Sequence, residues 1–255
     1  MGFDENGGSE LPDGLGEGMV GKTIELALQT KIDFDYADEL PFEIWREFVL
    51  NYANTNEARS NWRPLFWKKL RPLVKENDTI GSVVRTLNTH MWEILSPADQ
   101  DRIFFEAGST PLIFDPMSIL AFGYASCTGL AILFIDALRT MGVPARIAGT
   151  AAWYQKREEG NHNWVEVWRD GEWYFLEPSA SKKPGGVDDL DRPPCERWFC
   201  TRHRFSDNPS NTTKVYTARL ESVQSTYYPL AWELANQDVP GEDVSSFYQK
   251  RCGKC

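Results

Sequence analysis

The sequence predicts an α+β fold in which helices come before an antiparallel sheet. An apolar pattern of helical spacing follows Cys127, and short strand-like runs come directly after it. The last two runs are joined by Asp170-Gly171, a pair typical of a tight hairpin turn. No regular alternation of strands and helices, as in a parallel sheet, is visible in the chain. We therefore expect helices packed on an antiparallel sheet rather than a doubly wound fold.

The composition is that of an ordinary globular protein. Of 255 residues, 42% are hydrophobic and 25% are charged, and the formal net charge is -10. A chain this acidic repels polyanions, so we expect no nucleic-acid partner. No run approaches the roughly 18 apolar residues of a membrane-spanning helix, so we expect no membrane partner either.

Four parts are predicted along the chain. Residues 1–20 are rich in Gly and acidic residues, and they offer too little apolar surface to become ordered. Residues 21–110 form a helical N-terminal region, and residues 111–235 form the core. Residues 236–255 are polar and are expected to be a loosely held tail.

Two amphipathic helices are predicted in the N-terminal region, over 41–52 and about 80–94, because apolar residues recur there at helical spacing. Basic and aromatic residues alternate between them, from Arg59 to Lys75. This run favours a solvated helix face with buried aromatic rings, and binding of an acidic partner is the alternative.

The next helix is predicted to begin at Cys127 and to end before Gly142, which stands where a helix-ending glycine belongs. A thiol is a good nucleophile only as a thiolate, and a helix N-terminus favours that anion. The free amides of the first turn could also bind an oxyanion. A single cysteine ahead of an apolar helix is more often a packing residue, so the prediction depends on its partners.

Strand-like runs follow over 145–153, 163–168 and 172–176. Of the three histidines, His162 opens the middle run and shares a face with Trp164 and Glu166 if the side chains alternate. A carboxylate is needed to orient the imidazole. Glu177 ends the next run across the hairpin and is the favoured candidate, and Glu166 is the alternative.

Together these segments resemble the transglutaminase-like superfamily. The matching stretches are YASCTGLAILFIDALRTMGVPARIAG, over 124–149, and NHNWVEVWRDGEWYFLEPS, over 161–179. The resemblance implies a papain-like core, with the catalytic cysteine at a helix N-terminus packed on an antiparallel sheet that carries the histidine and the acid. It thus implies a triad of Cys127, His162 and Glu177. The upstream helical segment and Arg197-Trp198-Phe199 are similar, more loosely, to a bacterial-type subgroup with a helical N-terminal region.

Two departures from the family pattern stand out. The acid before proline is usually Asp, whereas here it is Glu177, which is one methylene longer. Thr128-Gly129 follows the cysteine and leaves the lining of the acyl pocket open.

The resemblance also implies an upstream side-chain donor to the oxyanion. Trp92 is a candidate because animal members use an indole for this purpose, and Asn88 and His90 lie equally near in the sequence. The alternative is that Trp92 is a core aromatic.

The four remaining cysteines lie in the last quarter of the chain: Cys195, Cys200, Cys252 and Cys255. Their spacing favours reduced thiols over a disulfide or a structural zinc site. No acidic loop of the calcium-binding kind is present in the sequence. We therefore expect neither a metal nor another cofactor.

The resemblance implies cysteine-dependent acyl transfer on an amide or peptide bond through a thioester, with hydrolysis by a peptidase or amidase favoured. Amine capture by a transglutaminase or amide synthase is the first alternative, and a non-catalytic protein-binding module on the same fold is the second. The expected partners are a peptide, protein or amide substrate and, for amine capture, an amine acceptor. The N-terminus resembles no secretory leader, so a cytoplasmic location is expected.

Overall fold

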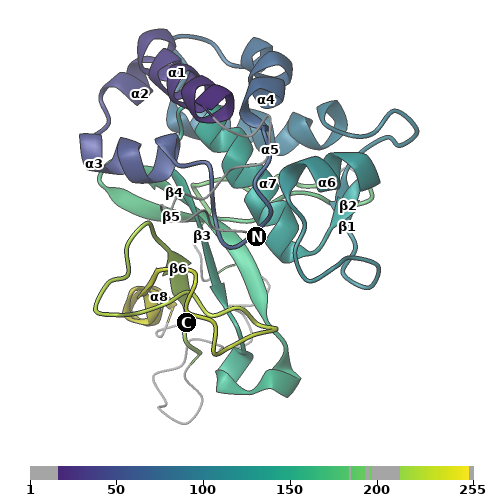
Figure 1. Ribbon diagram of the computed structural model, residues 1–255, viewed down its shortest axis with the longest axis vertical. Coiled ribbons are helices and arrows are strands. Elements are labelled where there is room, and N and C mark those ends of the chain that lie inside the picture. The colour runs from purple at the N-terminus through teal and green to yellow at the C-terminus, as the bar shows by residue number, and fades with distance from the viewer. Residues whose placement is uncertain (1–16, 184, 193–195, 197–212, 253–255) are drawn as a thin grey trace, which may run out of the picture.

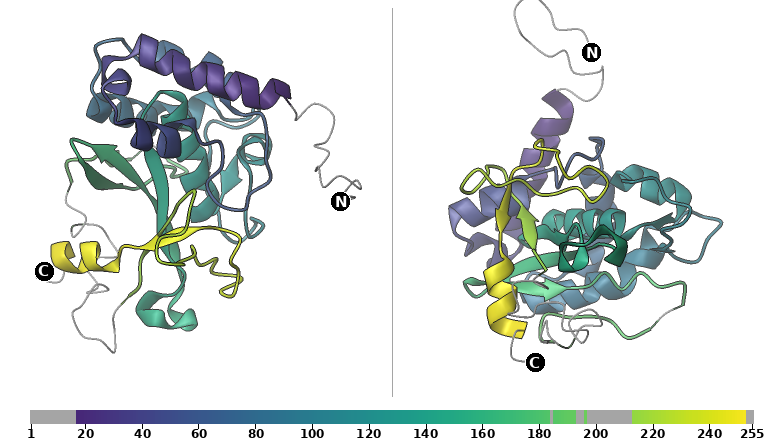
Figure 2. Two further views of the ribbon diagram at one scale, coloured as in Figure 1. Left: turned by 60° about the vertical axis from the view of Figure 1, so that its left-hand side comes forward. Right: turned by 90° about the horizontal axis from the view of Figure 1, so that it is seen from below.

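The computed structural model describes residues 17–183, 185–192, 196 and 213–252. Several helices gather at one end of the molecule, above a central sheet, whereas the C-terminal helix lies toward the other end (Figures 1 and 2). Residues 1–16 of the predicted disordered segment lie outside the described residues. Residues 17–20 belong to the first helix, so the packed region begins earlier than expected.

Short helices make up most of the N-terminal region. The predicted helix over 80–94 is present with the same bounds, and the one predicted over 41–52 is an α-helical turn that continues as a π-helix. The elements are α1 (Glu17–Asp33), α2 (Asp35–Asp38), α3 (Phe42–Trp45), η1 (Arg46–Leu50), α4 (Arg63–Leu70), η2 (Arg71–Leu73) and α5 (Ile80–Ile94).

The basic and aromatic run agrees with its prediction except at one residue. Trp62 and Phe66 are buried, and Lys68 and Lys69 are exposed. Arg63, however, is only 1% exposed. Its guanidinium donates to the carbonyls of Val49 and Arg139, because a buried cation needs several acceptors in place of water. This arginine is therefore part of the core and not of a solvated face.

The helix that begins at Cys127 is confirmed as the central helix of the fold. All its residues after the cysteine are buried, and it packs against β3 and β4. Three elements before it were not predicted because they are very short. They are β1 (Phe104–Phe105), α6 (Pro116–Phe122) and β2 (Tyr124–Ala125), and α7 (Cys127–Thr140) follows them.

A five-stranded antiparallel sheet confirms the predicted α+β class. The strand order is β5-β4-β3-β6-β7, and Asp170 and Gly171 both have positive φ in the β4–β5 turn. Two single 3-10 turns, η3 (Trp153–Gln155) and η4 (Arg157–Glu159), connect β3 to β4. The strands are β3 (Ala145–Thr150), β4 (His162–Arg169), β5 (Glu172–Leu176), β6 (Tyr216–Ala218) and β7 (Gly241–Asp243).

Different residues pack against the two faces of this sheet. Val165 and Val167 of β4 belong to the main core with α7. Trp164 and Phe175 belong to a second cluster, which contains Tyr248 of α8 (Ser245–Cys252). Side chains alternate along a strand, so neighbouring residues of β4 serve different layers.

The segment from residue 236 is not the loosely held tail that was expected. It contributes β7 and α8, and Tyr248 is fully buried. Its hydroxyl accepts from Trp164 Nε1 at 2.8 Å and donates to Glu166 at 2.5 Å. A few such anchors outweigh the low apolar content of the segment.

Cys252 is disulfide-bonded, which corrects the prediction of a reduced thiol at this position. Cys195, Cys200 and Cys255 lie outside the described residues, as do His203 and Arg197-Trp198-Phe199. Disulfides are typical of oxidising compartments, so this bond does not support the expected cytoplasmic location.

Among the described helices, none has the length and apolar content needed to cross a bilayer.

Candidate active site

Cys127 lies at the first position of α7, directly after the short strand β2. The N–H of Leu130 donates to the carbonyl of Ser126, which leaves the N–H groups of the first turn without helical acceptors. These groups and the helix dipole favour an anion at the sulfur. The thiol is half-buried and free.

His162 is the first residue of β4 and pairs with Thr150 of β3. Because α7 packs against β3 and β4, the imidazole meets the sulfur of Cys127 and the two side chains form a hydrogen bond. Burial raises the pKa of the Cys127 thiol, but the hydrogen bond and positive charge of His162, with a hydrogen bond from the Asn163 backbone N–H, lower it by more. The net pKa of Cys127 lies below its ordinary value.

Glu177 follows β5 and bonds to the far side of the same imidazole. His162 Nε2 lies 2.8 Å from Glu177 Oε1, which leaves Nδ1 of the ring for the cysteine. Burial lowers the pKa of His162, but the charge of Glu177 and hydrogen bonds to both partners raise it to about 10. At neutral pH the arrangement therefore favours a thiolate next to an imidazolium.

Asn88 of α5 holds the segment that carries Glu177. Its Nδ2 donates to the carbonyls of Glu177, at 2.9 Å, and Asp188, at 3.0 Å, and its Oδ1 accepts from Ser179 N–H at 2.8 Å. The Asp188 carboxylate also accepts from the Glu177 N–H at 2.8 Å. Asn88 was considered as an oxyanion donor, but its polar atoms position the acid instead.

Asn163 forms a second support, directly behind the sulfur. Its Oδ1 accepts from the hydroxyl of Tyr228 at 2.6 Å, and its Nδ2 donates to Thr128 Oγ1 at 2.6 Å. Gly149 faces Asn163 across the β3–β4 pair, and a Cβ there would lie 2.1 Å from Asn163 Oδ1. The network thus requires a glycine at this position.

The structure does not bring Glu166 to the triad. Its carboxylate is 1% exposed, accepts from Arg146 Nε at 2.7 Å and from the Tyr248 hydroxyl at 2.5 Å, and does not line the cleft above Cys127. The carboxylate thus serves the cluster between the sheet and α8.

Trp92 and His90 are also placed away from the cysteine. Trp92 is fully buried, its Nε1 donates to the carbonyl of Asn88 at 2.9 Å, and its ring packs edge-on against Phe134. His90 is exposed on α5. Trp92 is therefore a core aromatic residue, which was the alternative to its role as an oxyanion donor.

A cleft of about 710 Å³ opens above the triad. Phe105, Leu112 and Trp232 line it together with the three triad residues.

Neither Asn163 nor Tyr228 was predicted from the sequence. Asn163 could have been suspected as a polar residue beside His162, but no local pattern points to Tyr228, which is 65 residues farther along.

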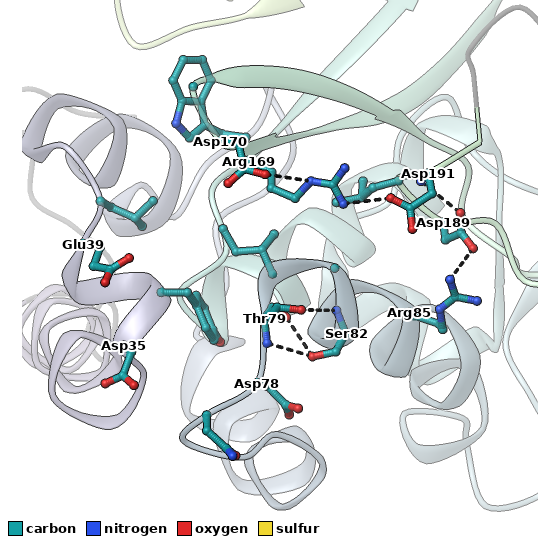
Figure 3. A pocket seen from close by; sticks show the side chains of 18 of the residues that line it. Asp35, Glu39, Asp78, Thr79, Ser82, Arg85, Arg169, Asp170, Asp189 and Asp191 are labelled. Carbon is teal, nitrogen blue, oxygen red and sulfur yellow. Dashed lines mark hydrogen bonds and ion pairs between the residues drawn. The ribbon is translucent and has the colours of Figure 1, made fainter.

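A different cavity, of about 900 Å³, lies between the start of α5 and the β4–β5 turn (Figure 3). Six of its described lining residues are acidic, and its two arginines are paired: Arg85 with Asp189 at 2.7 Å and Arg169 with Asp191 at 3.1 Å. None of the predicted site residues lines this cavity. Within the described ranges, no three His, Cys, Asp or Glu side chains gather in a way that could hold a metal ion.

A cysteine at a helix N-terminus, facing a histidine and a carboxylate on an antiparallel sheet, is the arrangement of papain-like cysteine enzymes. Residues 99–178 match the family model of the Transglutaminase-like superfamily, and this stretch contains all three triad residues. The match confirms the resemblance that the sequence indicated, over the part of the chain that carries these three residues.

Two solved structures are similar to this chain, each at 15% sequence identity. One is a candidate cysteine protease from Cytophaga hutchinsonii, with a TM-score of 0.41 over 84% of this chain and 66% of that one. The chain thus spans just under two thirds of the Cytophaga protein. The other is LapG from Legionella pneumophila, with a TM-score of 0.37 over 88% of this chain and 92% of that one. Both similarities are distant, so the assignment depends on the family model, and no curated protein matches the chain.

Proposed function

We propose that this protein hydrolyses an amide or peptide bond through a thioester on Cys127. The coupling of Cys127, His162 and Glu177 carries this proposal, because it supplies a thiolate, a proton donor and a group that orients the donor. The substrate would be a peptide, a protein or another amide.

The reaction begins when the sulfur of Cys127 attacks the substrate carbonyl carbon. The C–S bond forms, and the carbonyl electron pair moves to the oxygen as an oxyanion. The intermediate then collapses, the C–N bond breaks, and the amine leaves with the proton that His162 donates. Water next attacks the thioester, His162 accepts its proton, the C–S bond breaks, and the carboxylic acid and the free cysteine remain.

Backbone amides at the start of α7 are the donors we assign to the oxyanion. They lie beside the nucleophile and have no helical acceptors. The indole of Trp92 takes no part in this scheme, because its N–H is already bonded to Asn88 in the core.

Solvent access supports water over an amine as the acyl acceptor. The side chains of His162 and Glu177 are 13% and 20% exposed, so water can reach the thioester beside the base. Amine capture by a transglutaminase or amide synthase is the alternative that the product test below distinguishes.

The proposal predicts an unusually reactive Cys127 at acidic pH. The test measures alkylation of this residue by iodoacetamide at pH 6, read by mass spectrometry, in the wild type, His162→Ala and His90→Ala. Loss of the imidazolium should return the thiol pKa toward about 8.5 and slow the reaction about 100-fold. His90→Ala is the matched control, because this histidine is exposed on α5, and it should react like the wild type. Equal rates in all three proteins would contradict the proposed ion pair.

Product masses separate hydrolysis from transfer. The protein is incubated with a mixed peptide library and a primary amine, with Cys127→Ala as the control. Hydrolysis predicts products in which cleavage has added water, whereas amine capture predicts products that carry the added amine. No product that depends on Cys127 would favour the non-catalytic binding module.

A further inference from the structure

We propose that the substrate presents an uncharged, bulky apolar group beside the reacting carbonyl, and that Phe105, Leu112 and Trp232 bind this group. The inference rests on the proposed function, because it assigns the substrate class of the same site.

The first observation is the charge of the cleft. Among the described residues, 17 line it, and the titratable ones of these are Cys127, His162 and Glu177. These three side chains are already engaged with one another. A charged substrate group would lose water in the cleft without gaining a counter-charge, and the cleft therefore disfavours it.

The second observation is the unusual exposure of the apolar side chains. Phe105 is 51% exposed and Leu112 is 63% exposed. Both side chains line the cleft, although they are among the ten large hydrophobic residues of the described chain that are exposed. Such exposed apolar surface beside a reactive group is typical of a ligand-binding surface.

The position of Phe105 is fixed relative to the triad. Its backbone pairs with Ala125, two residues before the cysteine, through the parallel β1–β2 pair. Its N–H donates to the carbonyl of Ala180, three residues after Glu177, at 2.8 Å. The backbone of Phe105 is thus held between the segments that carry Cys127 and Glu177.

Trp232 belongs to a segment that is also anchored. Tyr228 N–H donates to the carbonyl of Val239 at 2.8 Å, Glu233 N–H donates to the carbonyl of Leu230 at 3.0 Å, and Leu230 is 1% exposed. The indole packs against the main core and still lines the cleft. It therefore adds a large, rigid apolar surface.

A neighbouring cavity shows that charged groups are kept apart from this surface. It shares Phe105, Glu177, Pro178 and Ala180 with the cleft, but its remaining lining includes Lys182, Asp188, Asp189 and Arg192. The two sides of the triad thus differ in polarity. Charged parts of a substrate fit the neighbouring cavity, and an apolar group fits the cleft.

The experiment compares three alkylating reagents at Cys127: iodoacetamide, N-benzyl iodoacetamide and N-(4-carboxybenzyl) iodoacetamide. Each rate is divided by the rate of the same reagent with N-acetylcysteine, which removes differences in intrinsic reactivity. We expect the benzyl reagent to exceed iodoacetamide about tenfold, the ratio that a modest gain in binding free energy produces. The carboxylate should remove most of this gain.

Phe105→Ala should lower the ratio of the benzyl rate to the iodoacetamide rate at least threefold. Leu112→Ala removes a second exposed side chain of the cleft and should lower the same ratio. Phe122→Ala is the matched control, because Phe122 is 54% exposed but does not line the cleft. A ratio of one in the wild type, or a ratio that survives both cleft substitutions, would overturn the apolar site. Slow labelling by iodoacetamide itself would instead contradict the proposed nucleophile, so the two failures are distinguishable.

Discussion

Asn163 shows that the candidate site also depends on residues that have no proposed catalytic role but position those that do. Its backbone N–H donates to the sulfur of Cys127, while its side chain connects Thr128 at the start of α7 to Tyr228. The phenol of Tyr228 is 2% exposed, so water cannot replace its hydrogen bond. The orientation of the residue behind the thiolate is thus determined by a tyrosine from a distant segment.

Tyr228→Phe should therefore affect both stability and reactivity. Loss of the hydroxyl leaves the Asn163 carbonyl oxygen buried without its donor, at a cost of about 1–3 kcal/mol in unfolding free energy. Alkylation of Cys127 at pH 6 should also become slower, because the Asn163 N–H is no longer held toward the sulfur. Urea denaturation and labelling by iodoacetamide measure the two effects.

Tyr216→Phe is the control for this variant, because Tyr216 is half-buried on β6 and is not part of the network. If Tyr228→Phe unfolds and reacts like the wild type, the network does not position the thiolate.

Individual contacts also decide whether Glu177 or Glu166 is the carboxylate beside His162. Side-chain alternation places Glu166 on the face of His162, but Arg146 and Tyr248 bind its carboxylate. Glu177 reaches the imidazole from the residue after β5, where Asn88 holds the chain. The sequence correctly favoured Glu177 as the neighbour of His162, but it could not exclude Glu166 because the partners of Glu166 are distant.

Among the elements, α7 is the one that the sequence defines best. Its apolar residues recur at helical spacing, and Gly142 follows its end with a φ of 76°. A Cβ on Gly142 would lie 2.8 Å from Cβ of Thr30 and 2.9 Å from Cβ of Ala37. The glycine thus ends the helix and also permits the close approach of α1 and α2.

Gly142→Ala should destabilise the protein by more than the backbone cost alone. An L-residue at positive φ costs about 1–2 kcal/mol, and the close contacts at this site add to that value. Gly171→Ala is the matched control, because Gly171 has a φ of 84° but open space around it. Equal losses of unfolding free energy in urea would show that packing at Gly142 contributes nothing.

Several of the elements that the sequence missed are short or polar. β1 and β2 have two residues each and β6 and β7 have three, so no periodic pattern can develop in them. α8 is polar on most positions and is held by Tyr248, which bonds to Trp164 and Glu166 of β4. Such elements exist because of their tertiary partners and not because of their own propensity.

At the scale of the whole molecule, buried polar groups join the N-terminal helices to α7. Asn54 Nδ2 donates to Asp136 Oδ1 at 2.9 Å, and Arg139 donates to the carbonyl of Ala53 at 2.8 Å. Asp136 Oδ2 is buried and has no hydrogen-bond partner among the described residues. Burial, with the charge of Glu57, raises the pKa of Asp136 well above its ordinary value, although Arg139 opposes the shift.

This raised pKa predicts a pH dependence of stability. Asp136 retains its proton in the folded state at pH values where the unfolded chain releases it. Its contribution to stability is therefore lost as the pH rises above the unfolded pKa of about 3.9. Asp136→Asn has no such proton, so its unfolding free energy relative to the wild type should increase by about 1 kcal/mol or more between pH 5 and pH 8.

Urea unfolding at the two pH values measures this difference. Asp35→Asn, at an exposed position of α2, is the control and should show no such trend. A difference between Asp136→Asn and the wild type that stays constant with pH would contradict a protonated Asp136.

The sequence by itself determined the helix that begins at Cys127, the hairpin that carries His162 and the order of Cys127, His162 and Glu177 along the chain. These features depend on the spacing and capping of residues that are close to one another in the sequence. Only the tertiary structure decided that Trp92 is a core residue, that Glu166 serves α8, and which side chains line the cleft. Those outcomes depend on pairs such as Asn88 with Glu177, 89 residues apart, and Glu166 with Tyr248, 82 residues apart. No local pattern encodes contacts at such separations, because they form only when the whole core packs.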